Sequence, residues 1–150
     1  MTRILFVCTG NICRSPMAVA VMQRFISEAG LDGQIVADSA GTGVWQPGAP
    51  PDRRAVAVGA ARHFEVRGVA RPVSVADFAD FDLLVAMDET HAQDLRELAP
   101  DRTGRLKVRL LLADGDVPDP YYGSSAAFER ALELIEAGCR ALLERVADSA

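Results

Sequence analysis

The junction between residues 4–7 and residues 17–30 constrains the fold more than any other part of the chain. The apolar run 4–7 predicts a short buried strand, and Ser15-Pro16 followed by apolar residues at helical spacing predicts the start of a helix. In a strand-to-helix turn the backbone N–H groups point inward, beside the positive end of the helix dipole. The turn formed by residues 8–14 is therefore expected to bind an anion of phosphate size.

Two side chains make this turn reactive. Cys8 closes the strand, and a thiol held over several N–H groups beside a guanidinium is expected to ionise near neutral pH and act as a nucleophile. Arg14 can hold two oxygens of the anion bidentately, which Lys cannot do. Gly10 permits a positive φ and close approach of the backbone, and Asn11 tolerates the left-handed region. We expect Ser15 to cap the helix and to hydrogen-bond the Cys8 sulfur.

Length and composition indicate one globular domain spanning residues 1–150. Apolar residues make up 49% of the chain and charged residues 25%, as in ordinary soluble proteins, and the formal net charge of −5 argues against a general nucleic-acid binder. No apolar run has the length of a membrane span, and the first residues lead directly into a strand. We expect a cytoplasmic protein that binds neither nucleic acid nor membrane.

The three cysteines are too few for a disulfide framework and predict no metal site. Cys8 and Cys13 are five positions apart, a zinc site needs four ligands, and both histidines are distant in the sequence. Cys139 falls on the apolar side of the last expected helix and is interpreted as a small buried hydrophobe. The sequence thus predicts no metal and no cofactor.

Strands and helices alternate along the whole chain. The patterns predict strands at residues 4–7, 34–37, 81–87 and 107–112, and helices at residues 17–30, 51–63, 75–78, 89–98 and 126–147. A long flexible loop is expected over residues 38–50 and an acidic loop over 113–123. This order predicts an α/β fold, with a single-domain open parallel sheet of about four strands, right-handed crossovers and helices on both faces, in a Rossmann-like arrangement.

Polar residues that could bind a ligand or take part in a reaction follow several of these strands. Ligands of open parallel sheets bind at the carboxyl ends of the strands, where Cys8, Ser39, Asp88 and the acidic loop all fall. Taken alone, the carboxylates of the acidic loop are typical of a solvated turn. They are Asp114, Asp116 and Asp119.

Two motifs resemble those of a known family. Residues 7–18, VCTGNICRSPMA, closely resemble the signature of low-molecular-weight protein-tyrosine phosphatases, and residues 119–123, DPYYG, resemble their acid-bearing loop. A cysteine followed six positions later by an arginine is common by chance, but the two longer motifs together are far more specific. The resemblance covers nearly the whole chain, and it implies the fold of that family and the hydrolysis of phosphotyrosine and small aryl phosphates.

The resemblance also assigns roles. It implies that Cys8 is the nucleophile of a phosphocysteine intermediate, that Arg14 and the loop amides clamp the phosphate, and that Asp119 is the general acid and base. The implied phosphate-binding loop consists of Thr9, Gly10, Asn11, Ile12, Cys13 and Ser15.

Further roles concern the surroundings of this loop. Trp45 is implied on one wall of the substrate cleft and Tyr121 and Tyr122 on the other, forming a deep slot for a flat ring, with a place in the core as the alternative for each. Ser39 is expected to brace Asn11, and Asp88 to support the site at a strand end. Cys13 is linked in the family to a protective disulfide with Cys8. A purely structural Cys13 is the alternative.

The chain departs from the family at Gly68, where many members carry a histidine, so a brace on Asn11 is expected to be missing. Three alternative functions share the fold or the loop. An arsenate reductase needs a further pair of cysteines, of which only Cys139 remains, and a protein-arginine phosphatase carries threonine in place of Ile12. A non-catalytic phosphate binder or phospho-carrier would not need Asp119. The expected partners are a phosphotyrosine-containing protein, such as a tyrosine kinase, and inorganic phosphate as product and inhibitor.

Overall fold

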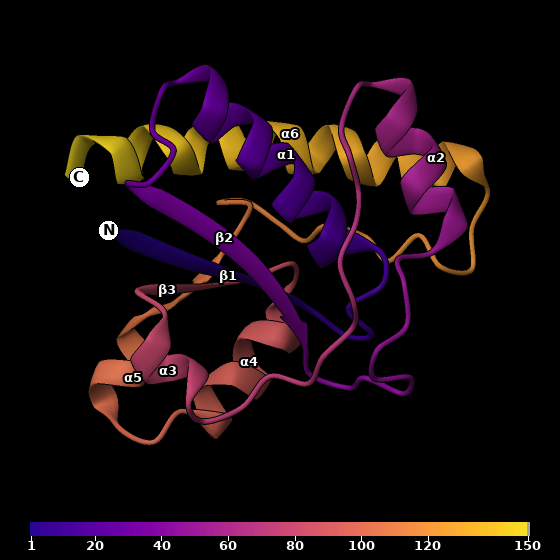
Figure 1. The fold of residues 1–150 in the computed structure, drawn as a ribbon. Coiled ribbons are helices and arrows are strands. Elements are labelled where there is room, and N and C mark those ends of the chain that lie inside the picture. Colours follow the sequence, from indigo (N-terminus) through magenta and orange to yellow (C-terminus); the bar gives the residue numbers. More distant parts are fainter. Residues whose placement is uncertain (150) are drawn as a thin grey trace.

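The computed structural model describes residues 1–149 and shows one sheet of parallel strands with helices on both faces (Figure 1). Its strand order is β2-β1-β3-β4, and each neighbouring pair is parallel. This confirms the predicted open parallel sheet. The strands are β1 (Thr2–Cys8), β2 (Ile35–Gly41), β3 (Leu83–Ala86) and β4 (Val108–Leu110).

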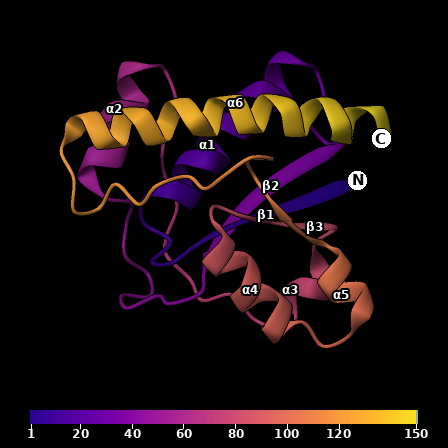
Figure 2. The ribbon, with the colours of Figure 1, turned by 180° about the vertical axis from the view of Figure 1, so that it is seen from behind.

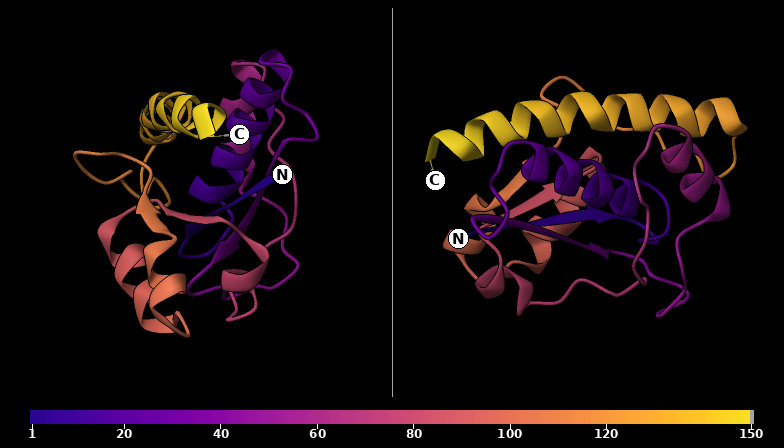
Figure 3. Two further views of the ribbon diagram at one scale, coloured as in Figure 1. Left: turned by 90° about the vertical axis from the view of Figure 1, so that its left-hand side faces the viewer. Right: turned by 45° about the horizontal axis from the view of Figure 1, so that its top comes forward.

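Two layers of helices enclose the sheet. On one face lie α1 (Arg14–Glu28), α2 (Arg53–Ala61) and the long α6 (Ser125–Ser149), which runs beside α1 (Figures 1 and 2). The other face carries α3 (Asp77–Asp80), α4 (Glu89–Leu98) and α5 (Arg102–Leu106). Figure 3 shows the sheet between these two layers, with α6 crossing above it.

Strand β1 is the structural centre because both of its faces are covered. Ile4 and Phe6 belong to the core under α1 and α6, while Leu5 and Val7 belong to the second core beneath α4, and all four are fully buried. Burial of each such side chain contributes about 1.5–3 kcal/mol. The end of β1, where Cys8 stands, is thereby held in a fixed position.

Several expected boundaries were wrong. Strand β2 continues to Gly41, because it pairs with β1 along its whole length, from Thr2 opposite Ile35 to Cys8 opposite Gly41. The long loop therefore begins at residue 42, four positions later than expected. The far end of β2 is held by a hydrogen bond from the Gly41 N–H to the carbonyl of Arg71. Helix α5 was not expected at all, and α2 ends at Ala61.

No helix within residues 1–149 combines the length and the apolar character needed to cross a membrane.

Candidate active site

The loop between β1 and α1 is fixed by the side chain of Asn11. Asn11 adopts a φ of 59°, confirming the predicted left-handed conformation. Its Nδ2 donates to Ser15 Oγ at 2.8 Å and to Ser39 Oγ at 2.9 Å, and its Oδ1 accepts the backbone N–H of Arg71 at 3.0 Å. In this chain, which carries Gly68, the main chain of Arg71 thus holds the side-chain oxygen of Asn11.

Gly10 serves the loop differently from the expectation. Its φ is not positive; instead, a Cβ at this position would lie 2.6 Å from Cη2 of Trp45. The close approach that requires glycine is thus that of an aromatic side chain. This contact ties the loop to Trp45, which comes from the segment after β2.

Cys8 lies at the end of β1 and is 3% exposed as a residue, and its sulfur is 2.9 Å from Ser15 Oγ. Because Ser15 Oγ accepts from Asn11 Nδ2, we assign its own proton to the hydrogen bond with the sulfur. The Ser15 hydroxyl is therefore placed as a hydrogen-bond donor to the nucleophilic sulfur position. Ser15 does not cap the helix, however, since α1 begins at Arg14 and its N-cap residue is Cys13, which makes no side-chain cap bond.

Arg14 is buried and locked from behind. Its Nη1 donates to Asp88 Oδ2 and to the carbonyl of Val117, both at 2.9 Å. Burial alone would raise the pKa of Asp88, but the hydrogen bond from the backbone N–H of His91 and the contact with Arg14 hold that pKa below its usual value. Asp88 is therefore an anionic support that orients the guanidinium.

Asp119 reaches the same guanidinium from the opposite side. Its Oδ2 lies 3.7 Å from Arg14 Nη2, its Oδ1 accepts the backbone N–H of Tyr121 at 3.1 Å, and its side chain is 47% exposed. Asp116 is more than a solvated residue, because its Oδ1 accepts the backbone N–H of Glu89 at 3.0 Å. The acidic loop is thus tied to the start of α4, and Asp119 is presented to the site.

One cavity of about 140 Å³ brings these residues together. Asn11, Ser15, Ser39 and Asp88 stand behind it as supports. A larger hollow of about 300 Å³ beside Thr2 and Asp82 has no cysteine in its lining. The lining of the smaller cavity consists of Cys8, Thr9, Gly10, Ile12, Cys13, Arg14, Trp45, Asp119, Tyr121 and Tyr122.

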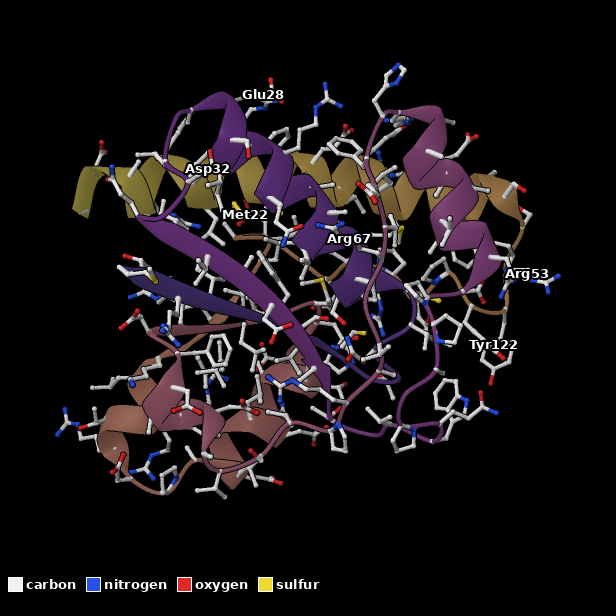
Figure 4. All side chains as sticks on the ribbon, viewed as in Figure 1. Met22, Glu28, Asp32, Arg53, Arg67 and Tyr122 are labelled. Carbon is white, nitrogen blue, oxygen red and sulfur yellow. The ribbon has the colours of Figure 1, made fainter. Side chains whose placement is uncertain are left out.

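The aromatic walls of the cavity touch each other. The rings of Trp45 and Tyr121 meet edge to face at a centroid distance of 5.9 Å, and Tyr122 packs edge to face on Tyr121 at 4.9 Å. Trp45 and Tyr122 are largely exposed, and Tyr122 lies at the rim on the side of Arg53, where α2 begins (Figure 4). Side chains of both expected walls therefore line the same cavity and contact each other.

Arg54 supports the tyrosine wall and was not singled out in the sequence. Asp52 holds it through two side-chain hydrogen bonds of 3.0 Å, and the guanidinium lies 5.4 Å from the centre of the Tyr121 ring. It also donates to the carbonyl of Gly123 at 3.4 Å. The signal in the sequence is an aspartate at the N-cap of a helix with an arginine two positions later.

His91 is the second residue that the sequence did not single out. It is 2% exposed, and its Nε2 lies 2.7 Å from Thr9 Oγ1, directly behind the anion loop. The available signal was its place on the first turn of a helix that follows Asp88 at the end of a strand.

The other two cysteines are buried thiols. Burial, followed by the charge of Asp52, raises the pKa of Cys13 to about 12, so this residue is protonated at neutral pH. Cys139 is fully buried, its thiol directed at the carbonyl of Ala18, and burial raises its pKa as well. The interpretation of Cys139 as a buried hydrophobe is confirmed.

Comparison with known proteins agrees with this geometry. The sequence profile described as low molecular weight phosphotyrosine protein phosphatase matches residues 3–150. The low molecular weight protein-tyrosine-phosphatase of Streptomyces coelicolor is 46% identical over 152 residues, covering 96% of this chain and 93% of that protein. The crystal structure of a protein tyrosine phosphatase from Entamoeba histolytica, with Hepes in the active site, superposes with a TM-score of 0.95 at 35% identity and covers 99% of each chain.

A structure of the YwlE arginine phosphatase, a mutant with a phosphorylated active-site serine, is also similar, at 29% identity with a TM-score of 0.87 over 97% of this chain and 96% of that one. The fold is therefore shared by proteins that are named tyrosine phosphatase and by one that is named arginine phosphatase. The profile match and the relative from Streptomyces coelicolor both carry the name of the low molecular weight tyrosine phosphatases. The chain belongs to the low molecular weight phosphotyrosine protein phosphatase family.

Proposed function

We propose that residues 1–150 form one catalytic domain that hydrolyses phosphotyrosine in a protein substrate through a phosphocysteine on Cys8. The observation that carries this proposal is the meeting of the Cys8 sulfur, the Arg14 guanidinium and the Asp119 carboxyl at one cavity of about 140 Å³. These three groups supply the nucleophile, the clamp for charge on the phosphoryl oxygens and the acid for the leaving oxygen.

The reaction proceeds in two displacements at phosphorus. In the first, the Cys8 thiolate forms the S–P bond while the P–O bond to tyrosine breaks, and Asp119 gives its proton to the departing phenolic oxygen. In the second, the Asp119 carboxylate takes a proton from water, the water oxygen attacks phosphorus, and the thiolate leaves. Arg14 remains in place through both steps, because Asp88 and the Val117 carbonyl hold its Nη1.

The cavity lining favours an aryl phosphate. Trp45, Tyr121 and Tyr122 offer ring faces and edges, and the apolar Ile12 stands where a protein-arginine phosphatase carries threonine. The test is turnover of phosphotyrosine, phosphoserine and phosphoarginine peptides of one sequence, with arsenate reduction assayed in parallel. We expect kcat/KM for phosphotyrosine to exceed the others by about 10². A higher value for phosphoarginine would overturn the assignment.

The Arg14→Lys variant should lower kcat/KM for an aryl phosphate by about 10², because an ammonium group cannot span two phosphoryl oxygens while also pairing with Asp88 and Val117. Steady-state kinetics measure the loss. Arg67→Lys is the matched control, since the side chain of Arg67 is 71% exposed and lines a different hollow (Figure 4). An unchanged kcat/KM in Arg14→Lys would count against the clamp.

Redox sensitivity of the site is also proposed. The Cys8 thiolate attacks hydrogen peroxide and breaks its O–O bond, which gives a sulfenic acid and hydroxide. The Cys13 thiol then loses its proton, its sulfur attacks the Cys8 sulfur, and the hydroxyl group leaves with that proton as water, closing a disulfide. Because the pKa of Cys13 is raised to about 12, closure should be slow at neutral pH and faster as pH rises.

Mild peroxide should therefore inactivate the enzyme reversibly, with phosphate protecting it and a Cys8–Cys13 disulfide detected by mass spectrometry. In Cys13→Ser, less activity should return on treatment with dithiothreitol, because oxidation of Cys8 continues past the sulfenic acid. Equal recovery of the two proteins would leave Cys13 with a structural role only.

The proposed partners follow from the chemistry. They are a phosphotyrosine-containing protein, such as a tyrosine kinase, and inorganic phosphate, which as the product should inhibit competitively. A cytoplasmic location is proposed because the nucleophile must remain a reduced thiol, and reducing compartments maintain thiols.

A further inference from the structure

A chain of four side chains lies behind the anion loop, and the reaction scheme above uses only part of it. Thr9 Oγ1 is 2.7 Å from His91 Nε2, and His91 Nδ1 is 3.1 Å from Asp88 Oδ1. Asp88 Oδ2 in turn accepts from Arg14 Nη1 at 2.9 Å. Thr9 and Arg14, the two ends of the chain, both line the cavity that contains Cys8.

The position of Asp88 determines which ring nitrogen of His91 carries the proton. A carboxylate oxygen only accepts, so a bare Nδ1 lone pair 3.1 Å from it would be repelled. We therefore place the proton of neutral His91 on Nδ1, although within residues 1–149 this atom has no partner in good hydrogen-bond geometry. The Asp88 oxygen beside it already accepts the backbone N–H of His91 at 3.0 Å.

With the proton on Nδ1, Nε2 is an acceptor and the Thr9 hydroxyl must donate to it. The Thr9 oxygen then has only lone pairs to offer an oxyanion. When His91 gains a second proton, Nε2 becomes the donor, and the Thr9 proton is free to point elsewhere. The direction of this one hydrogen bond is thus set by the charge of the ring.

Charged groups of both signs face His91. Burial of the ring is the main cause that lowers its pKa, and Arg14 acts in the same direction, whereas Asp88, Asp94 and Asp119 oppose it. The ring is therefore neutral above its usual pKa of about 6.5 and becomes cationic only on the acid side of it. An anion placed in the cavity would add to the three carboxylates and favour the cation.

We propose that His91 is a positioning residue whose protonation reverses the Thr9 hydrogen bond and so strengthens oxyanion binding in the active-site cavity. The proposal rests on the proposed function in taking this cavity as the phosphate site. A second effect acts in the same direction: cationic His91 shares the charge of Asp88, which leaves more of the positive charge of Arg14 for the bound anion.

The first experiment measures the binding of sulfate, a tetrahedral anion whose charge does not change over the range studied, through the fluorescence of Trp45, the sole tryptophan of the chain. Wild type, Thr9→Val, Thr9→Ser and His91→Gln are titrated at several pH values. Cys8 and Asp119 are present in all four proteins, so their direct contributions to sulfate binding are common to each variant and the wild type.

From about pH 7.5 to about pH 5, the ratio for Thr9→Val and for His91→Gln should grow about tenfold, while that for Thr9→Ser stays near one, since serine keeps the hydroxyl. A purely structural His91 would lower affinity equally at every pH. A ratio that does not change with pH would overturn the proposal.

The second experiment follows the nitrogen resonances of the two histidines in the wild-type protein. At neutral pH, His91 should show the proton on Nδ1, and saturating sulfate should raise the pKa of His91 by about 1, the reciprocal of tenfold tighter binding. His63, beyond the end of α2 and away from the cavity, is the internal reference and should not respond to sulfate. A His91 titration that is the same with and without sulfate would overturn the proposal. Neither experiment depends on turnover, so failure of the proposed catalytic function would appear separately, in the peptide assay.

Discussion

The Cys8→Ser variant is expected to lose turnover of aryl phosphates by a factor on the order of 10⁶. Its hydroxyl is not ionised at neutral pH, so no nucleophile remains at the end of β1. Oxyanion binding should persist, because the loop is held by Asn11 and the guanidinium of Arg14 by Asp88. Single-turnover kinetics and a sulfate titration on the same preparation separate the two effects.

Cys139→Ala provides the matched control for this variant. Cys139 is buried between α6 and α1, away from the cavity, so its removal should leave kcat unchanged. Hydrolysis by Cys8→Ser near the wild-type rate would remove Cys8 from the mechanism. Loss of sulfate binding in the same variant would mean that the sulfur is needed to maintain the loop.

The second large effect concerns Asp119. Asp119→Asn should lower kcat on phenolic esters by about 10²–10⁴, the usual contribution of a general acid. The loss should depend on the leaving group, because a basic phenolate needs the proton more than an acidic one does. Over a series of aryl phosphates, the rate of the variant should fall steeply as the pKa of the leaving phenol rises, while that of the wild type stays nearly flat.

Asp114→Asn controls for loss of charge in the same loop. Asp114 is exposed and does not line the cavity, so this variant should retain both kcat and the flat dependence. If Asp119→Asn also keeps a flat dependence with near-normal kcat, the acid is another group. The expected loss in Asp119→Asn, by contrast, would distinguish a phosphatase from a carrier or binding protein, neither of which protonates a leaving group.

The parts of the structure that were predicted well are those governed by local pattern. Residues 4–7 are apolar without interruption, and burial of both faces of β1 follows from that run. The helix expected over residues 89–98 has the observed bounds because Asp88 caps it and Leu95 and Ala92 face the core. The order of alternating elements was sufficient for the parallel sheet, since parallel strands require crossover connections.

The parts that were missed depend on contacts between distant segments. Residues 38–41 are polar or small and resemble a loop, yet they form strand because β1 offers paired backbone groups along its whole length. The edge contact of Trp45 with Tyr121 joins segments more than seventy positions apart, and no local pattern specifies it. His91 was set aside as too distant from the cysteines, because the proximity of α4 to the anion loop exists only in the folded chain.

Asp88 places folding and chemistry under one constraint. One of its oxygens accepts the His91 N–H and begins α4, while the other holds Arg14 in the site. Asparagine could keep the cap but not the charge, and glutamate could keep the charge but is a poor cap. Neither asparagine nor glutamate can replace aspartate in both roles, so helix stability and catalysis cannot be tuned separately at this position.

Because the pKa of Asp88 is lowered in the folded protein, its stabilising contribution is present at neutral pH and disappears as the pH falls through that lowered value. Protonation of Asp88 in acid should therefore weaken the N-cap of α4 and the ion pair with Arg14 at the same pH.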